Sequence, residues 1–420
     1  MIRHALSSTA VALILSTSAL AAEPEEVTKT YADIAAANYE DSLITARSLQ
    51  TAVNALVADP SSETLSAARA AWLAARVPYQ QTEVYRFGNA IVDDWEGKVN
   101  AWPLDEGLID YVDATYGGAS DENGLAALNV IANPTFTLSG AQVDAMSITA
   151  SLLEDTLQEA GGNEANVATG YHAIEFLLWG QDLNGTDAGA GDRPWTDYAA
   201  GDLCTNGNCD RRADYLTAAT DLLVSDLDWM VGQWQIGGAA RAQVMSDPVA
   251  GLTAMMTGMG SLSYGEVAGQ RMRLGLMLND PEEEHSCFSD NTHNDHFYDG
   301  LGVQNAYLGS YTRIDGTVVS GPSLSDLVAE ADPALDVEMR TALSDTMMAL
   351  GQIKTTAEAG FAYDRMLTRG NDAGEALVMG GVNGLINQTR SLERVVAVLG
   401  ADALEIEGSD SLDDPGAVFQ

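Results

Sequence analysis

Histidine is scarce in this chain, and its few positions show where metal or acid–base chemistry could take place. Of five histidines, His4 lies in an N-terminal leader and His172 stands alone in an apolar segment. The other three are clustered at His285, His293 and His296. Imidazole is a common metal ligand and the usual group that titrates near neutral pH. These two segments are therefore the first candidates for a site.

The apolar segment 170–180 reads Gly-Tyr-His-Ala-Ile-Glu-Phe-Leu-Leu-Trp-Gly. His172 and Glu175 are three residues apart and share one face of a helix, so an imidazole nitrogen and a carboxylate oxygen can converge on one cation. A carboxylate in such surroundings needs a metal, an arginine or a hydroxyl as its partner. The same spacing also allows a plain His–Glu hydrogen bond, so H-x-x-E alone leaves both interpretations open.

Two further segments are rich in potential ligands. Residues 282–296 hold three histidines, five acidic residues and three hydroxyls, although a solvated polar loop has the same composition. Residues 72–88 place Glu83 among aromatic residues and two arginines, where an isolated ion pair is the simpler explanation. Downstream, more oxygen ligands are supplied by Asp93, Asp94, Asp105 and Glu106.

Several motifs that would indicate other chemistry are absent from the sequence. There is no H-E-x-x-H, no phosphate-binding Walker loop, no G-x-G-x-x-G after a strand and no G-x-S-x-G. No C-x-x-C-H is present either, which excludes covalent haem attachment. The sequence therefore gives no support to zincin-type hydrolysis, nucleotide use or a serine nucleophile.

The charge balance excludes another group of partners. The 420 residues include 61 acidic and 20 basic side chains, a formal net charge of −41. This field repels nucleic acid and anionic membranes and attracts cations, although an acidic surface can also serve solubility alone. Apolar residues make up 46% of the chain, enough for a folded core.

The N-terminus is typical of an export signal. A short polar start precedes the apolar run 5–20, and Ala-Leu-Ala at 19–21 is a cleavage signature. We expect residues 1–22 to be removed, and no cysteine follows to carry a lipid anchor. No later stretch reaches the ~18 apolar residues of a membrane span. The sequence thus predicts a periplasmic or secreted protein with no transmembrane segment.

Three cysteines suit an oxidising compartment. Cys204 and Cys209 flank Thr-Asn-Gly-Asn, whose Asn-Gly pair favours a tight turn. We predict a local disulfide across this turn; a metal knuckle is the alternative, although two thiols without a nearby histidine make a poor site. Cys287 is left over, either as a buried inert residue or as a free thiol.

Apolar spacing predicts an all-α protein made of antiparallel helical bundles. Stripes with helical spacing run along 43–56, 216–234 and 385–399. Similar Asp-Pro helix starts follow related segments near residues 60 and 333, so we expect a two-lobed fold with a duplicated repeat. The predicted domains are residues 23–210, which carry G-x-H-x-x-E, and 211–420, which carry the 285–296 segment. Long loops are expected at 93–125, 180–212 and 280–323.

The G-x-H-x-x-E motif at 170–175 and the Phe-Leu-Leu-Trp-Gly that follows resemble the signature of the imelysin family. Four more segments resemble the family in the same order, and the last two are most similar to its iron-regulated protein A branch. These segments are 72–88, 193–198 with 204–212, 265–272 and 285–292.

This resemblance implies a two-lobed helical fold and an extracytoplasmic protein linked to iron uptake. It also implies a metal site centred on His172 and Glu175, with Glu83 as the third participant. Many members are lipid-anchored or membrane-associated, and this chain departs from them in lacking the lipobox cysteine. The resemblance and the ligand-rich segments together extend the candidate site to Asp105, Glu266, His285, Ser286 and Asp290.

Two functions remain open at this point. In the first, the protein binds iron or a similar transition metal and takes part in iron handling, with other envelope iron-uptake proteins as partners. In the second, it is a zinc-dependent metallopeptidase, a class in which the family has also been placed. Glu83 would then be the general base, and Arg76 or Arg86 the oxyanion donor. Either site needs neutral His172, so we expect metal affinity to weaken below about pH 6.

Overall fold

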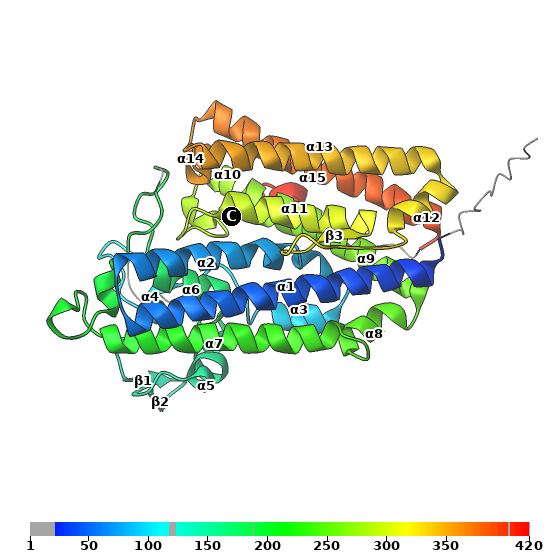
Figure 1. The fold of residues 1–420 in the computed structure, drawn as a ribbon. Helices are drawn as coiled ribbons and strands as arrows, with labels where there is room; N and C mark the ends of the chain where they lie inside the picture. The colour runs from blue at the N-terminus through cyan, green and yellow to red at the C-terminus, as the bar shows by residue number, and fades with distance from the viewer. Residues whose placement is uncertain (1–21, 117–122, 188, 402–403, 420) are drawn as a thin grey trace, which may run out of the picture.

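The computed structural model describes residues 22–116, 123–187, 189–401 and 404–419. The predicted leader therefore lies outside the described residues, apart from Ala22. Helices dominate the described part of the chain, and its strands form two short antiparallel hairpins (Figure 1). The prediction of an all-α fold is confirmed. The hairpins are β1 (Thr135–Leu138) with β2 (Ala141–Asp144), and β3 (Ser310–Thr312) with β4 (Val318–Ser320).

The first bundle is built around α1 (Pro24–Ala58), which packs along α2 (Ser62–Gln80) and α7 (Cys209–Trp234). Helix α6 (Gly170–Trp179) packs against α2 and α7 and is buried along its whole length. The apolar stripes predicted in α1 and α7 face this core, because their members are buried. Shorter elements surround it: α3 (Ala90–Glu96), α4 (Glu106–Ile109), α5 (Ala150–Leu152) and α8 (Ala239–Met245).

The second bundle lies beside the first, in the upper half of Figure 1. Its long helices are α13 (Pro333–Glu358) and α15 (Asp372–Leu399), which pack on each other. Against them lie α9 (Pro248–Ser261), the π-helix η6 (Leu262–Arg273) and α11 (Thr292–Leu308). The remaining short helices are α10 (Leu274–Leu278), α12 (Leu324–Ala331), α14 (Tyr363–Leu367) and α16 (Asp410–Asp413).

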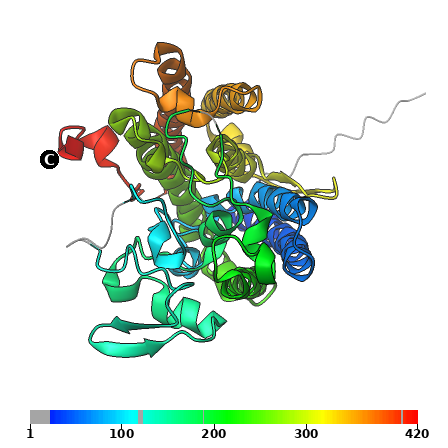
Figure 2. The same cartoon turned by 90° about the vertical axis from the view of Figure 1, so that its left-hand side faces the viewer.

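The two bundles meet where α2 packs on α11 and α1 packs on α9 (Figures 1 and 2). A Cβ at Gly302 of α11 would lie 2.7 Å from the carbonyl oxygen of Gln81, so glycine allows the bundles to approach closely here. The predicted division at residue 210 does not match this packing, because α7 covers α1 and α6 and belongs to the first bundle. The duplication of one bundle into the other stays a prediction.

Two local predictions differ from the structure. The start of α2 is capped by Ser61, not Asp59, because Ser61 and Thr64 form a reciprocal capping box; Asp332 caps α13 as the Asp-Pro pattern predicts. The expected loop 280–323 contains the 17-residue helix α11, whose polar face is turned toward other polar groups of the interior.

None of the helices in the described ranges is long and apolar enough to cross a membrane.

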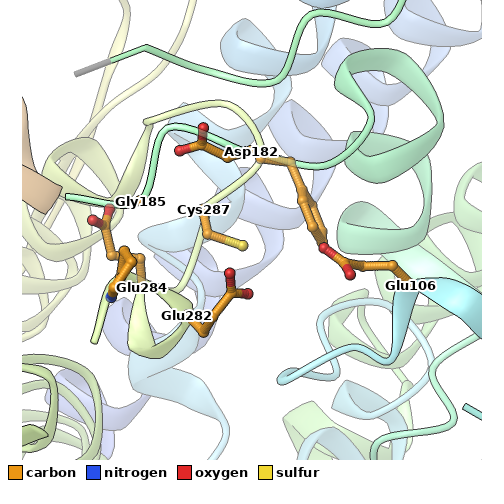
Figure 3. Close-up of a pocket in the computed structure, with 8 residues that line it drawn as sticks. Glu106, Asp182, Gly185, Glu282, Glu284 and Cys287 are labelled. Atoms are coloured by element: carbon orange, nitrogen blue, oxygen red, sulfur yellow. The ribbon is translucent and has the colours of Figure 1, made fainter. Parts of the chain in front are cut away.

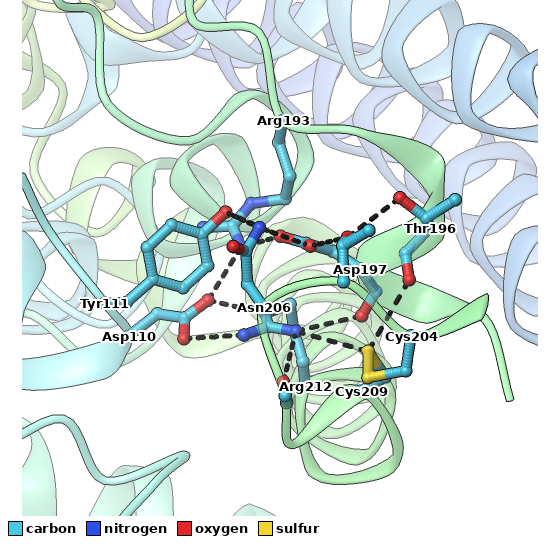
Figure 4. The surroundings of a disulfide bond; sticks show 11 residues. Asp110, Tyr111, Arg193, Thr196, Asp197, Cys204, Asn206, Cys209 and Arg212 are labelled. Atoms are coloured by element: carbon cyan, nitrogen blue, oxygen red, sulfur yellow. Dashed lines mark hydrogen bonds and ion pairs between the residues drawn. A yellow bond between two sulfur atoms is a disulfide. The ribbon is translucent and has the colours of Figure 1, made fainter. Parts of the chain in front are cut away.

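Cys204 and Cys209 are joined by a disulfide at the start of α7 (Figure 4). Behind it, Asp110 accepts hydrogen bonds from Arg212 at 2.6 and 3.0 Å and from Arg193 at 2.7 Å. These three charges are buried, and the two guanidiniums hold the pKa of Asp110 below its usual value despite burial. The disulfide thus closes a turn beside this ion-pair network, and the hydrogen bonds of the network do not depend on the disulfide.

Replacing Cys204 and Cys209 together by Ser is expected to lower the free energy of unfolding by at most about 2–3 kcal/mol, since a short loop gains little from closure. Non-reduced peptide mass spectrometry of the wild type should show the two residues linked. Chemical denaturation of both proteins gives the stability difference. Free thiols at these positions, or a bond from either one to Cys287, would contradict the assignment.

Candidate functional site

The candidate site begins with the backbone of Gly170. Its φ is +76°, and a Cβ on it would lie 2.4 Å from the carbonyl oxygen of Val99. Only glycine fits this close approach. The next amide, Tyr171 N, donates to the same carbonyl at 2.7 Å. The glycine of G-x-H-x-x-E therefore sets where α6 starts and how deep His172 lies.

His172 and Glu175 form a hydrogen-bonded pair inside the first bundle. His172 Nδ1 lies 2.9 Å from Glu175 Oε2, and the side chains are 1% and 0% exposed. The other oxygen, Oε1, accepts from the amide and hydroxyl of Ser289 at 3.0 and 2.7 Å. Both carboxylate oxygens are thus engaged. Glu175 orients the imidazole, and Ser289 orients Glu175.

The environment favours the uncharged form of each partner. Burial raises the pKa of Glu175 to about 8. Burial, and then the neighbouring His285, hold the pKa of His172 well below its usual value. With Nδ1 on Glu175, the remaining ring nitrogen is Nε2, and it has no hydrogen-bond partner among the described residues. Such carboxylate–histidine pairs are typical behind metal ions, because they fix the ring and leave one nitrogen free.

His285 provides a second pair of the same kind, directly opposite. Its ring centroid lies 4.7 Å from that of His172, with an angle of 71° between the rings. Its Nδ1 lies 3.2 Å from Asp295 Oδ2. Asp295 also accepts hydrogen bonds from Arg76 and Ser286, and Nη2 of Arg76 lies 3.4 Å from Nδ1 of His285. Nε2 of His285, like that of His172, has no partner among the described residues.

A cleft of about 420 Å³ reaches His285 from outside. Burial, followed by the charge of Arg271, keeps the pKa of His285 well below its usual value. The neutral imidazole therefore forms part of the wall of this cleft. The acidic and basic residues that line the cleft are Arg86, Glu96, Glu159, Glu164, Glu266 and Arg271.

Arg271 organises the far wall of this cleft. It donates to Glu83 at 3.2 Å and to Asp299 at 3.0 Å, and its Nη2 lies 2.8 Å from Glu266. Glu266 and Arg271 are five residues apart on η6, and a π-helix brings such residues onto one face because its bonds run from i to i+5. Burial, together with Glu83 and Glu266, raises the pKa of the adjacent Glu96 to about 7.

The structure therefore brings some of the residues predicted for the site together and places others elsewhere. His285 joins His172, whereas Glu83 is an ion-pair partner of Arg271. Within the described ranges, no group of three or more potential ligands with mutually close ligand atoms includes His172. The other predicted residues separate as follows: Glu266 lines the cleft, Ser286 bonds Asp295, Asp105 bonds Tyr116 and Asn123, and Asp290 meets Asp182 and Asp364.

Sequence reasoning missed Asp299 and Glu96 and did not assign Asp295 a role. The i, i+4 spacing of Asp295 and Asp299 in one helix was an available signal, since it places both on the same face.

The thiol of Cys287 is not in a disulfide, and burial among carboxylates raises its pKa well above the usual value, so it is not a reactive thiolate.

The fold and this buried H-x-x-E site define the class of the protein. The family model described as Imelysin matches residues 35–392, and the chain belongs to the imelysin family. No curated protein matches the chain in sequence.

Two solved structures share the fold. One is a protein described as an iron-regulated protein A precursor from Parabacteroides distasonis, with 18% identity, a TM-score of 0.64, and coverage of 91% of this chain and 97% of that one. The other is an imelysin-like protein from Psychrobacter arcticum, with 16% identity, a TM-score of 0.56, and coverage of 91% and 99%. At such identities, the likeness extends to the fold alone.

Proposed function

We propose that this protein is an exported metal-binding protein of iron handling, which binds iron or a similar transition metal through Nε2 of His172 and Nε2 of His285. The supporting observation is the facing pair of neutral imidazoles, each oriented by a carboxylate and each with a free Nε2. Imidazole nitrogen suits Fe, Zn and related ions better than Ca²⁺ or Mg²⁺. Glu175 and Asp295 would orient the ligands and balance the charge.

The cleft beside His285 supports a role in which the metal is cargo. The cleft connects solvent to His285, one of the two proposed ligands, and a chain with a net charge of −41 concentrates cations around itself. The predicted leader and the Cys204–Cys209 disulfide suit a periplasmic or secreted location. The name of one structural relative, the iron-regulated protein A precursor, supplies the link to iron.

The metallopeptidase alternative is less well supported by the geometry. A peptidase needs a carboxylate free to act on a metal-bound water. Glu83 is paired with Arg271, and both oxygens of Glu175 are hydrogen-bonded. The proposed base would therefore have to break a buried ion pair before it could act.

Two measurements on the chelator-treated mature protein test the proposal. Calorimetry with Zn²⁺, and with Fe²⁺ under anaerobic conditions, should show one tight site per chain. Incubation of the metal-loaded protein with casein should give no cleavage. Absence of tight binding would refute the proposal, and metal-dependent cleavage would favour the peptidase.

Metal binding is expected to release about one proton at pH 7 and almost none at pH 9. Below its pKa of about 8, Glu175 is protonated in the metal-free protein, and a cation on His172 expels that shared proton. Affinity should then fall roughly tenfold per pH unit below pH 8. The limit near pH 6 expected from an ordinary histidine does not apply, because the pKa of His172 is already far lower.

Calorimetry with Zn²⁺ in buffers of different ionisation enthalpy measures this proton release. The Glu175→Gln variant, which has no proton to lose, is the control and should release none. Equal release by the wild type at pH 7 and pH 9 would show that another group is being titrated.

A further inference from the structure

Three aspartates from distant parts of the chain meet where the two bundles adjoin. Asp182 follows α6, Asp290 precedes α11, and Asp364 lies in α14. One carboxylate oxygen from each lies within 4.8 Å of those of the other two. We call these three residues the triple-aspartate cluster. Because like charges repel at such distances, the arrangement itself requires an explanation.

Asp364 provides an observation independent of the clustering. Its side chain is only 2% exposed, and neither oxygen has a hydrogen-bond partner among the described residues. The amides of its own turn lie close enough to lower its pKa slightly but make no well-formed hydrogen bond to it. A buried carboxylate without a partner is costly. One of its oxygens lies within 4.8 Å of an oxygen of each of the other two aspartates.

The other two aspartates are held in place by single hydrogen-bonded oxygens. Oδ1 of Asp182 accepts from the amide and side chain of Asn184 at 2.8 and 2.7 Å. Oδ2 of Asp290 accepts from the Gly189 amide at 3.1 Å. In each carboxylate this fixes one oxygen and leaves the second as a potential ligand.

Further carboxylates and a small cavity adjoin the cluster. Glu284 is 2% exposed, its Oε1 has no partner among the described residues, and the charges of Asp364 and Asp290 act on it. Figure 3 shows Asp182 and Glu284 beside a cavity that Glu106 also lines. The cavity volume is about 10 Å³, room for about one water molecule.

The titration of the cluster agrees with this geometry. Burial, then the neighbouring carboxylates, raise the pKa of Asp364 to about 7 and that of Asp290 to about 6. The carboxylates therefore disfavour one another's ionised form, and a bound cation would remove that penalty.

We propose that the triple-aspartate cluster, with Glu284 beside it, is a second cation site that takes one hard divalent ion, with Ca²⁺ as the best match. Its donors are all oxygen, and several carboxylates from separate segments suit Ca²⁺ better than Mg²⁺, which keeps more of its water. The site would tie the loop after α6 in the first bundle to α14 in the second. It does not depend on the iron site, since neither histidine takes part.

The test uses the chelator-treated mature protein and CaCl₂ alone. Calorimetry should show one Ca²⁺ per chain, and Ca²⁺ at saturating concentration should raise the melting temperature by a few degrees. The Asp364→Asn variant should melt at or above the wild type without Ca²⁺, because a carboxamide can donate to Asp182 or Asp290. It should show no rise in melting temperature with Ca²⁺.

Asp187→Asn is the matched control, since Asp187 is an exposed acid in the same loop as Asp182; it should keep the full response to Ca²⁺. His172→Asn should keep it too, which separates this site from the iron site. The proposal is overturned if Ca²⁺ does not raise the melting temperature of the wild type. It is also overturned if Asp364→Asn responds as strongly as Asp187→Asn, because the effect would then be general screening of the acidic surface.

Discussion

His172→Asn is expected to lower the affinity for Zn²⁺ or Fe²⁺ by about 100-fold or more with little change in fold. Asparagine can place its amide nitrogen near the position of Nδ1, so the bond to Glu175 is kept while the ligand atom Nε2 is lost. Residues that only support a metal ligand typically contribute about 10–100-fold, and a ligand should exceed them. His285→Asn should have the same effect, because its Nδ1 pairs with Asp295 in the same way.

Calorimetry and circular dichroism on the two variants measure affinity and helix content. His293→Asn is the matched control, because this half-buried histidine on α11 lies outside the proposed site and its Nε2 is bonded to the side-chain amide of its neighbour Asn294. Glu175→Ala should fall between the control and His172→Asn in affinity. If His172→Asn and His285→Asn bind metal as tightly as His293→Asn, the facing imidazoles are not the site.

Arg271→Met is expected to destabilise the protein by about 3–5 kcal/mol at neutral pH, the usual effect of removing one partner from a buried ion pair. Methionine keeps much of the side-chain length but leaves Glu83 and Asp299 without their cation. The variant tests whether Arg271 holds the cleft wall together.

The loss should shrink as the pH falls. Burial already raises the pKa of Asp299 well above its usual value, so this carboxyl is neutralised easily once its partner is gone. A carboxyl with a raised pKa in the folded state favours folding at low pH and opposes it at high pH. Urea denaturation at pH 5 and pH 8 measures the difference. Arg273→Met, a partly exposed position on the same element, should change stability by less than about 1 kcal/mol.

A destabilisation of Arg271→Met no larger than that of Arg273→Met would mean that the buried network contributes little. A loss that grows toward acid pH would contradict the role given to Asp299. The first result would also weaken the case against the peptidase, because that case rests on the cost of separating Glu83 from Arg271.

The sequence by itself determined what depends on near neighbours along the chain. Helical stripes such as 43–56 follow from the period of the α-helix, and the shared helix face of His172 and Glu175 follows from their spacing of three. The Cys204–Cys209 disulfide is of the same kind, since a five-residue separation around an Asn-Gly turn brings the sulfurs together. Such contacts require no knowledge of which helix packs on which.

Only the tertiary structure decided which distant groups share a site. His285 faces His172, and Glu83 is paired with Arg271, because the packing of the two bundles, where α2 meets α11, brings these distant segments of the chain together. The sequence shows that Glu83 needs a cation but not whether an arginine or a metal supplies it. The triple-aspartate cluster is similar, because each aspartate looks like an ordinary loop or helix-end residue until the bundles meet. Partner choice in the interior depends on which charges the packing buries together, and spacing along the chain does not contain that information.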